Sequence, residues 1–164
     1  FQGNCLFINQ KEDYVDIFKK KKTVFELLGK PDYKIPFNLL GHLPVIKAKI
    51  GGMVVFCGID TGSSIHLVDE ELTKKYCLNK GAGNYEYVKG IGTENLVRKE
   101  IKIIPRLEAG NAVQWETDCV PANLSHLQEP TFNWKIEALL GMPFFKHYKY
   151  ILIDYRSLNI FMWE

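Results

Sequence analysis

No segment of this sequence is apolar over the roughly 18 consecutive residues that a membrane-spanning helix needs, so we predict that the chain contains no such helix. A charge excess is also missing, because 21 lysines and arginines face 19 aspartates and glutamates, which leaves a formal net charge of +2. The basic run Lys19–Lys22 has no interleaved arginines and aromatic side chains. We interpret it as a solvated face, and we predict no nucleic-acid partner.

Closely spaced cysteines are absent as well. Cys5, Cys57, Cys77 and Cys119 lie far apart, and no two of them form a Cys-x-x-Cys pair. This spacing disfavours a zinc site although four histidines are present, so we predict no bound metal. The cysteines are expected to be buried or idle thiols, with one disulfide allowed if the protein is exported. A catalytic Cys–His pair is disfavoured because nothing in the sequence places a cysteine beside a histidine.

The 164 residues, 46% of them hydrophobic, suffice for one folded domain and fall short of two ordinary ones. Phe1–Gly3 resembles the remainder of a cleaved purification tag, so the natural start is expected near Asn4. We expect a partly helical N-terminal extension over residues 4–34 and the main domain over residues 35–164.

Within the extension, residues 13–29 show apolar side chains at roughly helical spacing. These are Tyr14, Ile17, Phe18, Phe25 and Leu28. Asp13 is suited to the N-cap position and Gly29 to the C-terminal stop. The pattern predicts one interrupted helix or two short helices.

From residue 35 onward the sequence consists of short apolar or alternating segments separated by turn residues. The predicted strands cover residues 35–40, 43–50, 53–59, 64–68, 112–122 and 158–163, with a strand–turn–strand unit over 86–105 and a strand–helix–strand unit over 138–155. Gly51-Gly52 predicts a two-residue hairpin turn, because both positions can take positive φ. Asp69 is placed to cap a short helix over residues 70–76. Many short strands and few helices predict a mainly β domain.

The tetrapeptide Asp60-Thr61-Gly62-Ser63 directly follows the apolar strand 53–59. Gly62 permits a tight turn whose amide N–H points at the Asp60 carboxylate. The Ser63 hydroxyl is expected to donate a second hydrogen bond to the outer carboxylate oxygen, and the Thr61 hydroxyl can pin the loop. Such a loop fixes one carboxylate and leaves an oxygen free to hold a water. On its own, however, the motif also suits a structural turn.

The chain has no second Asp-Thr-Gly or Asp-Ser-Gly. Peptide hydrolysis by carboxyl groups needs two of them, close enough to share one proton, so that one acts as base and the other as acid. If the motif is catalytic, a second copy of the chain must therefore supply the partner carboxylate.

Three segments occur in the order found in the retropepsin-like aspartic protease family. FCGIDTGSS, residues 56–64, resembles its catalytic strand and loop; VKGIGT, residues 88–93, its glycine-rich flap; and ALLGMPFF, residues 138–145, the segment that passes beneath the loop. The similarity spans about residues 43–156, and the sequence is particularly like bacterial single-domain members. The resemblance implies a closed, mainly β barrel or sandwich with short helices and one lobe per chain.

By the same resemblance, Asp60 is the catalytic acid and base, and Thr61, Gly62 and Ser63 support it, with Thr61 bonded to its copy in a second subunit. The expected flap and substrate-binding residues are Gly90, Ile91, Gly92 and Thr93. The residues expected to buttress the loop are Leu139, Leu140 and Gly141. His66 is expected to be a surface or packing residue and not a catalytic one.

The implied protein is a homodimeric aspartic endopeptidase that acts on polypeptides with apolar residues near the cut and needs no cofactor. Relatives of this kind are often exported, which favours a periplasmic or envelope location. Two alternatives stay open: a catalytically silent peptide-binding or dimerisation module with the same fold, and one half of a longer two-lobed protease. Some 40 residues before the first core strand, an extra segment at about 121–136 and residues 157–164 depart from the viral pattern, so they leave the mode of dimerisation open.

Overall fold

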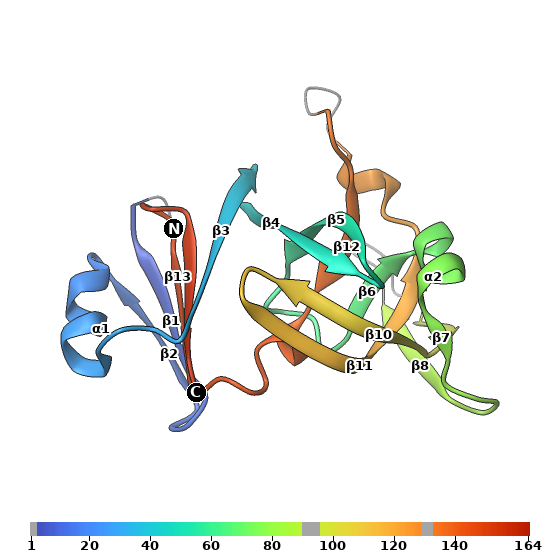
Figure 1. The fold of residues 1–164 in the computed structure, drawn as a ribbon, viewed down its shortest axis with the longest axis horizontal. Coiled ribbons are helices and arrows are strands. Elements are labelled where there is room, and N and C mark those ends of the chain that lie inside the picture. Colours follow the sequence, from blue (N-terminus) through green and yellow to red (C-terminus); the bar gives the residue numbers. More distant parts are fainter. Residues whose placement is uncertain (1–2, 90–95, 129–132) are drawn as a thin grey trace.

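A computed structural model describes residues 3–89, 96–128 and 133–164 of the chain. Its strands form two neighbouring assemblies, a closed barrel and an open antiparallel sheet that contains both ends of the chain (Figure 1). The barrel strands are β4 (Leu43–Ile50), β5 (Met53–Ile59), β6 (His66–Asp69), β10 (Lys102–Ala109), β11 (Ala112–Ala122) and β12 (Ile136–Leu140). The open sheet contains β1 (Cys5–Asn9), β2 (Tyr14–Phe18), β13 (Tyr150–Asp154), β14 (Asn159–Trp163) and β3 (Tyr33–Leu40), which continues into the barrel.

The barrel closes because β4, which pairs with β5, also pairs with β10 at the other end of the order β4-β5-β12-β6-β11-β10. In β4, Ile46, Ala48 and Ile50 are buried whereas Lys47 and Lys49 are exposed, which is the two-residue period of a strand with one face on a core. The β4–β5 hairpin turns at Gly51 and Gly52, with φ of 56° and 87°. The predicted glycine turn is confirmed.

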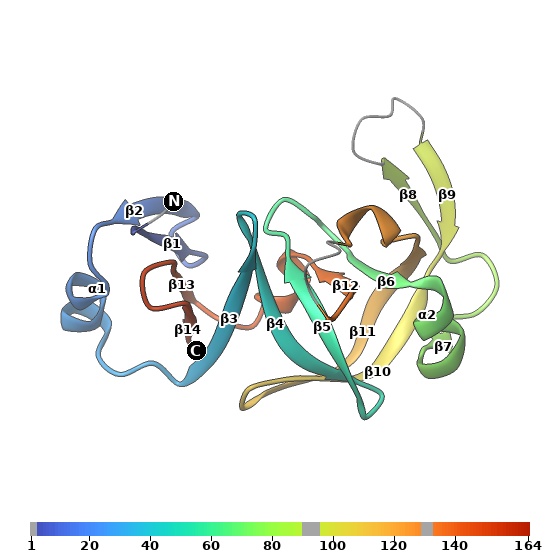
Figure 2. The ribbon, with the colours of Figure 1, turned by 90° about the horizontal axis from the view of Figure 1, so that it is seen from above.

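Helix α2 (Glu70–Tyr76) begins where predicted, because the Asp69 carboxylate accepts hydrogen bonds from the N–H groups of Glu71 and Leu72. It leads into the short strand β7 (Leu78–Asn79), which pairs with β10. A separate hairpin of β8 (Tyr85–Lys89) and β9 (Leu96–Glu100) projects from the barrel (Figure 2). Two single-turn helices, η1 (Ser125–Leu127) and η2 (Met142–Phe144), flank β12 in the chain.

The N-terminal segment is helical only in its second half. Helix α1 (Lys21–Leu28) ends at Gly29, whose φ is 77°, as predicted. The predicted helix is wrong over residues 14–18, which form β2 and pair antiparallel with β1. Asp13 therefore lies at the β1–β2 turn, with φ of 53°, and caps no helix. The sequence of β2, Tyr-Val-Asp-Ile-Phe, is rich in residues that favour strands, and pairing with β1 overrides the apparent helical spacing.

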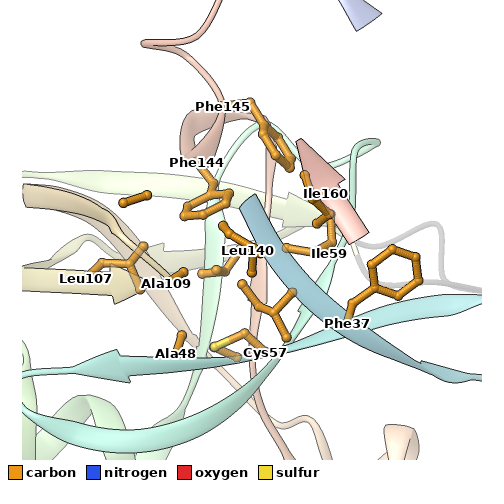
Figure 3. Packing of buried hydrophobic residues seen from close by; sticks show 14 of the residues in the cluster. Phe37, Ala48, Cys57, Ile59, Leu107, Ala109, Leu140, Phe144, Phe145 and Ile160 are labelled. Atoms are coloured by element: carbon orange, nitrogen blue, oxygen red, sulfur yellow. The ribbon is translucent and has the colours of Figure 1, made fainter. Parts of the chain in front are cut away.

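One buried apolar cluster runs from the barrel into the open sheet. Figure 3 shows Leu107, Ala109 and Cys57 from barrel strands together with Phe144 and Phe145 after β12 and Ile160 from β14. A second cluster packs α1 onto the open sheet, with Phe25 edge-on to both Phe161 and Trp163. Because the first cluster is continuous, the barrel and the open sheet meet across a packed interior. No helix in the described ranges is long and apolar enough to cross a membrane.

Candidate active site

Asp60 stands where β5 leaves the barrel. Strand β12 runs parallel to β5, with Leu139 opposite Gly58 and Leu140 opposite Ile59, and it lies between β5 and β6. The Asp60 N–H donates a hydrogen bond to the Leu140 carbonyl at 3.0 Å. The structure thus places the loop that joins β5 to β6 directly beside the segment that resemblance assigned to its support.

The loop holds the Asp60 carboxylate from its own backbone. The Gly62 N–H donates to Asp60 Oδ1 at 3.0 Å, as predicted, and the Ser63 N–H donates to the Asp60 carbonyl at 3.1 Å. The prediction for the Ser63 hydroxyl is wrong. It donates to the Ile65 carbonyl at 2.6 Å, because the turn after Ser63 brings that carbonyl within hydrogen-bond distance of the hydroxyl. Asp60 itself is half-buried, while Thr61 and Gly62 are exposed.

At Gly141 and Met142, the end of β12 packs against this loop. The N–H of the next residue, Met142, donates to the Ser63 carbonyl at 2.8 Å. A Cβ on Gly141 would lie 2.5 Å from the Ser63 carbonyl oxygen and 2.8 Å from that of Ile65, closer than real Cβ atoms approach. Only glycine therefore lets the end of β12 pack against the backbone that follows Asp60.

His66 in turn holds Gly141 in place by a hydrogen bond. The Gly141 N–H donates to His66 Nδ1 at 3.1 Å, so the ring is neutral and carries its proton on Nε2. Burial and, to a smaller extent, the nearby Lys146 lower the pKa of His66 to about 4, although Asp118 opposes both effects. Within the described part of the chain, Nε2 has no hydrogen-bond partner. His66 is thus fully buried, in agreement with the packing role and not the surface role expected for it.

A cavity of about 360 Å³ opens beside Asp60. On the loop side its lining includes Asp60, Ser63 and Ser64, and on the opposite side Glu86, Tyr87 and Val88 of β8. Asn123, Leu124 and His126, from the segment noted as extra in the sequence, complete one wall. The predicted flap residues Gly90, Ile91, Gly92 and Thr93 lie outside the described residues, but β8 and β9 lead to that segment as a paired hairpin.

The sequence did not identify Tyr87, Asn123 or His126 as parts of the site. Tyr87 directly precedes the glycine-rich motif of residues 88–93, so its position next to that motif was the available signal. Asn123 and His126 carry no motif, and only the long β11 strand and η1 bring them to the cavity.

Thr61 faces a different space from Asp60. It lines a second cavity, of about 570 Å³, together with Met142 and with Leu6, Ile8, Tyr14 and Val15 of the β1–β2 hairpin. The N-terminal hairpin therefore adjoins the Asp60 loop, and the exposed Thr61 is not among the residues that line the cavity beside Asp60. Among residues 3–89, 96–128 and 133–164, no three His, Cys, Asp or Glu side chains gather as a metal site.

Neither a family model nor a curated protein matches this sequence. Among solved structures, the chain is similar to a retropepsin-like aspartic protease from Rickettsia conorii, with a TM-score of 0.52 and 15% sequence identity. The match covers 80% of this chain and 89% of that one. A likeness at this identity shows the fold alone. The predicted mainly β, retropepsin-like barrel with short helices is confirmed.

Proposed function

We propose that this protein is an aspartic endopeptidase in which two Asp60 carboxyl groups, one from each chain of a homodimer, activate a water molecule. The observation that carries this function is the Asp60 loop itself. Its carboxylate is held by the Gly62 N–H at the edge of a cavity that β8 also lines, on a fold shared with a retropepsin-like aspartic protease. Asp60, Thr61, Gly62 and Ser63 keep the roles that the resemblance assigned to them, apart from the corrected Ser63 bond.

The chemistry follows from two carboxyl groups that share one proton. The ionised group takes a proton from the water as its oxygen attacks the scissile carbonyl carbon. The protonated group donates its proton to the carbonyl oxygen, which gives a neutral tetrahedral intermediate. When the C–N bond breaks, the leaving amine receives a proton from the dyad. No step needs a metal or an organic cofactor.

A second copy is required because the chain supplies only one Asp-Thr-Gly. Two features favour its approach at the Thr61 side. Thr61 is exposed beside the second cavity, and β2 is an edge strand whose Tyr14, Val15 and Ile17 are all exposed. An apolar, unpaired strand edge favours association with another chain. A two-fold axis passing near Thr61 would make this contact isologous and set one Asp60 against the other.

The lining of the cavity suits an extended polypeptide with apolar side chains. Ile65, Leu67, Val88 and Leu139 contribute apolar surface next to Asp60. A peptide that lies between the loop and the β8–β9 hairpin can add backbone hydrogen bonds as an extra strand does. In this proposal Gly90, Ile91, Gly92 and Thr93 close over the peptide, while Leu139, Leu140 and Gly141 support the loop from below.

The substitution Asp60→Asn tests catalysis directly. Asparagine keeps the size and the acceptor oxygen but cannot exchange the proton, so cleavage of a peptide library rich in apolar residues should fall by at least about 10³-fold. The matched control is Asp118→Asn, an exposed carboxylate paired with Lys80, which should retain the wild-type rate. Cleavage products are identified by mass spectrometry.

The outcomes separate the proposal from its alternatives. If Asp60→Asn cleaves as fast as the wild type, Asp60 is not the catalytic group. If the wild-type protein binds the same peptides and cleaves none of them, the chain is a silent peptide-binding module. If cleavage appears only after another polypeptide is added, the chain is one half of a two-lobed protease.

A further inference from the structure

Two of the four cysteines meet where the end of helix α2 lies near β11. The Cys119 thiol donates a hydrogen bond to the Cys77 sulfur, with 3.9 Å between the Sγ atoms. Cys77 ends helix α2 and precedes β7, on one side of β10, and Cys119 lies in β11 on the other side of β10. A disulfide bond is about 2.05 Å long, so the two sulfurs would need to approach by roughly 2 Å.

The two thiols differ in exposure and in proton affinity. Cys77 is half-buried and lines a cavity of about 380 Å³, whose lining also includes Lys74 and Lys102. The hydrogen bond from Cys119 lowers the pKa of Cys77, and Lys102 lowers it further, although burial opposes both effects. The pKa of the buried Cys119 is raised, first by its hydrogen bond to Cys77 and then by burial. Cys77 is therefore the accessible nucleophile, and Cys119 is the thiol behind it.

The other two cysteines have neither the exposure nor the lowered pKa of Cys77. Cys5 and Cys57 are both buried, with 1% and 0% of their surface exposed. Burial raises the pKa of each thiol, to about 12 for Cys5. They serve as internal controls, because a reaction that is specific for Cys77 and Cys119 leaves both of them as free thiols.

We propose that Cys77 and Cys119 form a redox-active dithiol that a low-molecular-weight disulfide converts into an intramolecular disulfide. The Cys77 thiolate attacks one sulfur of the small disulfide, forms a mixed disulfide and releases one small thiolate. The Cys119 sulfur then attacks the Cys77 sulfur, loses its proton and expels the second small thiolate, which takes up a proton. The protein loses two electrons and two thiol hydrogens, and the small disulfide is reduced to two thiols.

The bond would constrain the part of the chain that contains β8, the strand that lines the cavity beside Asp60. Residues 77 and 119 enclose the whole β8–β9 hairpin, so the disulfide would close a loop that contains it. It would also tie the end of α2 to β11, where Cys119 stands opposite His66 of β6 in the parallel ladder. Closing this loop removes freedom from the unfolded chain, so the oxidised protein should melt at a higher temperature than the reduced protein.

The test treats the reduced, folded full-length protein with oxidised glutathione, blocks the remaining thiols and maps the peptides. The expected product is a single Cys77–Cys119 cross-link with Cys5 and Cys57 still free. Cys119→Ser should instead accumulate one glutathione on Cys77, because no second thiol resolves the mixed disulfide. Cys77→Ser should acquire neither a cross-link nor glutathione on Cys119, and the control Cys5→Ala should still form the cross-link.

Four free thiols in the treated wild type would overturn the proposal, and so would a cross-link that involves Cys5 or Cys57. A Cys119→Ser protein that folds, by circular dichroism, but binds no glutathione would overturn it too. If that variant fails to fold, the peptide map of the wild type alone decides. None of these readouts uses peptide cleavage, so the result is independent of the proposed protease activity.

Discussion

Gly141 is the residue whose chemistry is most constrained, because a side chain there would collide with the backbone that follows Asp60. We expect Gly141→Ala to destabilise the fold by roughly 1–3 kcal/mol and to displace the Asp60 loop, so that activity falls more than stability predicts. Gly58→Ala is the control. The nearest atoms to its added methyl are side-chain atoms of Leu139 and Leu43, at 2.6 to 3.3 Å, and not backbone atoms.

Thermal unfolding and peptide cleavage, measured on both glycine variants, check this expectation. If Gly141→Ala melts and cleaves as the wild type does, the packing of β12 against the loop is not what holds Asp60 in place. If Gly58→Ala loses as much activity as Gly141→Ala, the loss of activity comes from general crowding in the barrel and not from displacement of the Asp60 loop.

His66 makes the stability of the protein depend on pH. Its pKa is 6.5 in the ordinary, unfolded environment and about 4 in the fold, so between these values the unfolded chain binds more protons. Stability should therefore fall as pH decreases from about 6.5 to about 4, by about 3 kcal/mol from this residue alone, and His66 adds no further loss below that range. A protease that works in acid would lose stability from this residue at its working pH.

The variant His66→Asn isolates this contribution. Asparagine offers a carbonyl oxygen to the Gly141 N–H but does not titrate, so the variant should show a shallower fall of unfolding free energy between pH 6.5 and 4. Its absolute stability is a separate quantity, since the smaller side chain leaves a cavity. Denaturant unfolding at several pH values measures the slope. An unchanged slope would show that other groups cause the acid sensitivity.

Among the elements, the β8–β9 hairpin is the one that should contact substrate. Tyr87 is 61% exposed and lines the cavity beside Asp60. Tyr87→Ala should raise KM about fivefold, corresponding to ~1 kcal/mol of lost aromatic contact, and leave the melting temperature unchanged. Tyr85→Ala is the matched control, because Tyr85 lies in the same strand, stacks with Arg98 and is not among the residues that line the cavity. Steady-state kinetics that give equal KM values for both variants would contradict a substrate-binding hairpin.

Elements set by local chemistry were predictable from the sequence. The Gly51-Gly52 turn and the Asp69 cap each depend on a few adjacent residues, and both are found in the structure. Strand β2 was not predictable, because only its pairing with β1 distinguishes it from a short helix. The bond from Gly141 to His66 joins residues 75 positions apart, and no local pattern encodes such a contact.

In the whole molecule, the barrel and the open sheet meet at the Asp60 loop, with Asp60 toward one cavity and Thr61 toward the other. The Asp-Thr-Gly and Leu-Leu-Gly motifs made the loop and the segment beneath it predictable from the sequence. The sequence could not supply the second cavity, because that depends on where the N-terminal hairpin packs. The sequence predicted that a second copy of the chain supplies the partner carboxylate, but it did not predict that Glu86 lines the same cavity as Asp60.

The measurement that tests the central claim most directly is a mixing titration of wild type with Asp60→Asn, at a fixed total concentration high enough for dimers and after subunits have exchanged. If two Asp60 groups form one site, heterodimers are inactive and activity follows the square of the wild-type fraction, so an equal mixture retains about one quarter of it. If each chain works alone, for example with Glu86 as the second acid, activity follows the wild-type fraction linearly. An equal mixture that retains about one half of the activity would contradict the homodimeric Asp60 dyad.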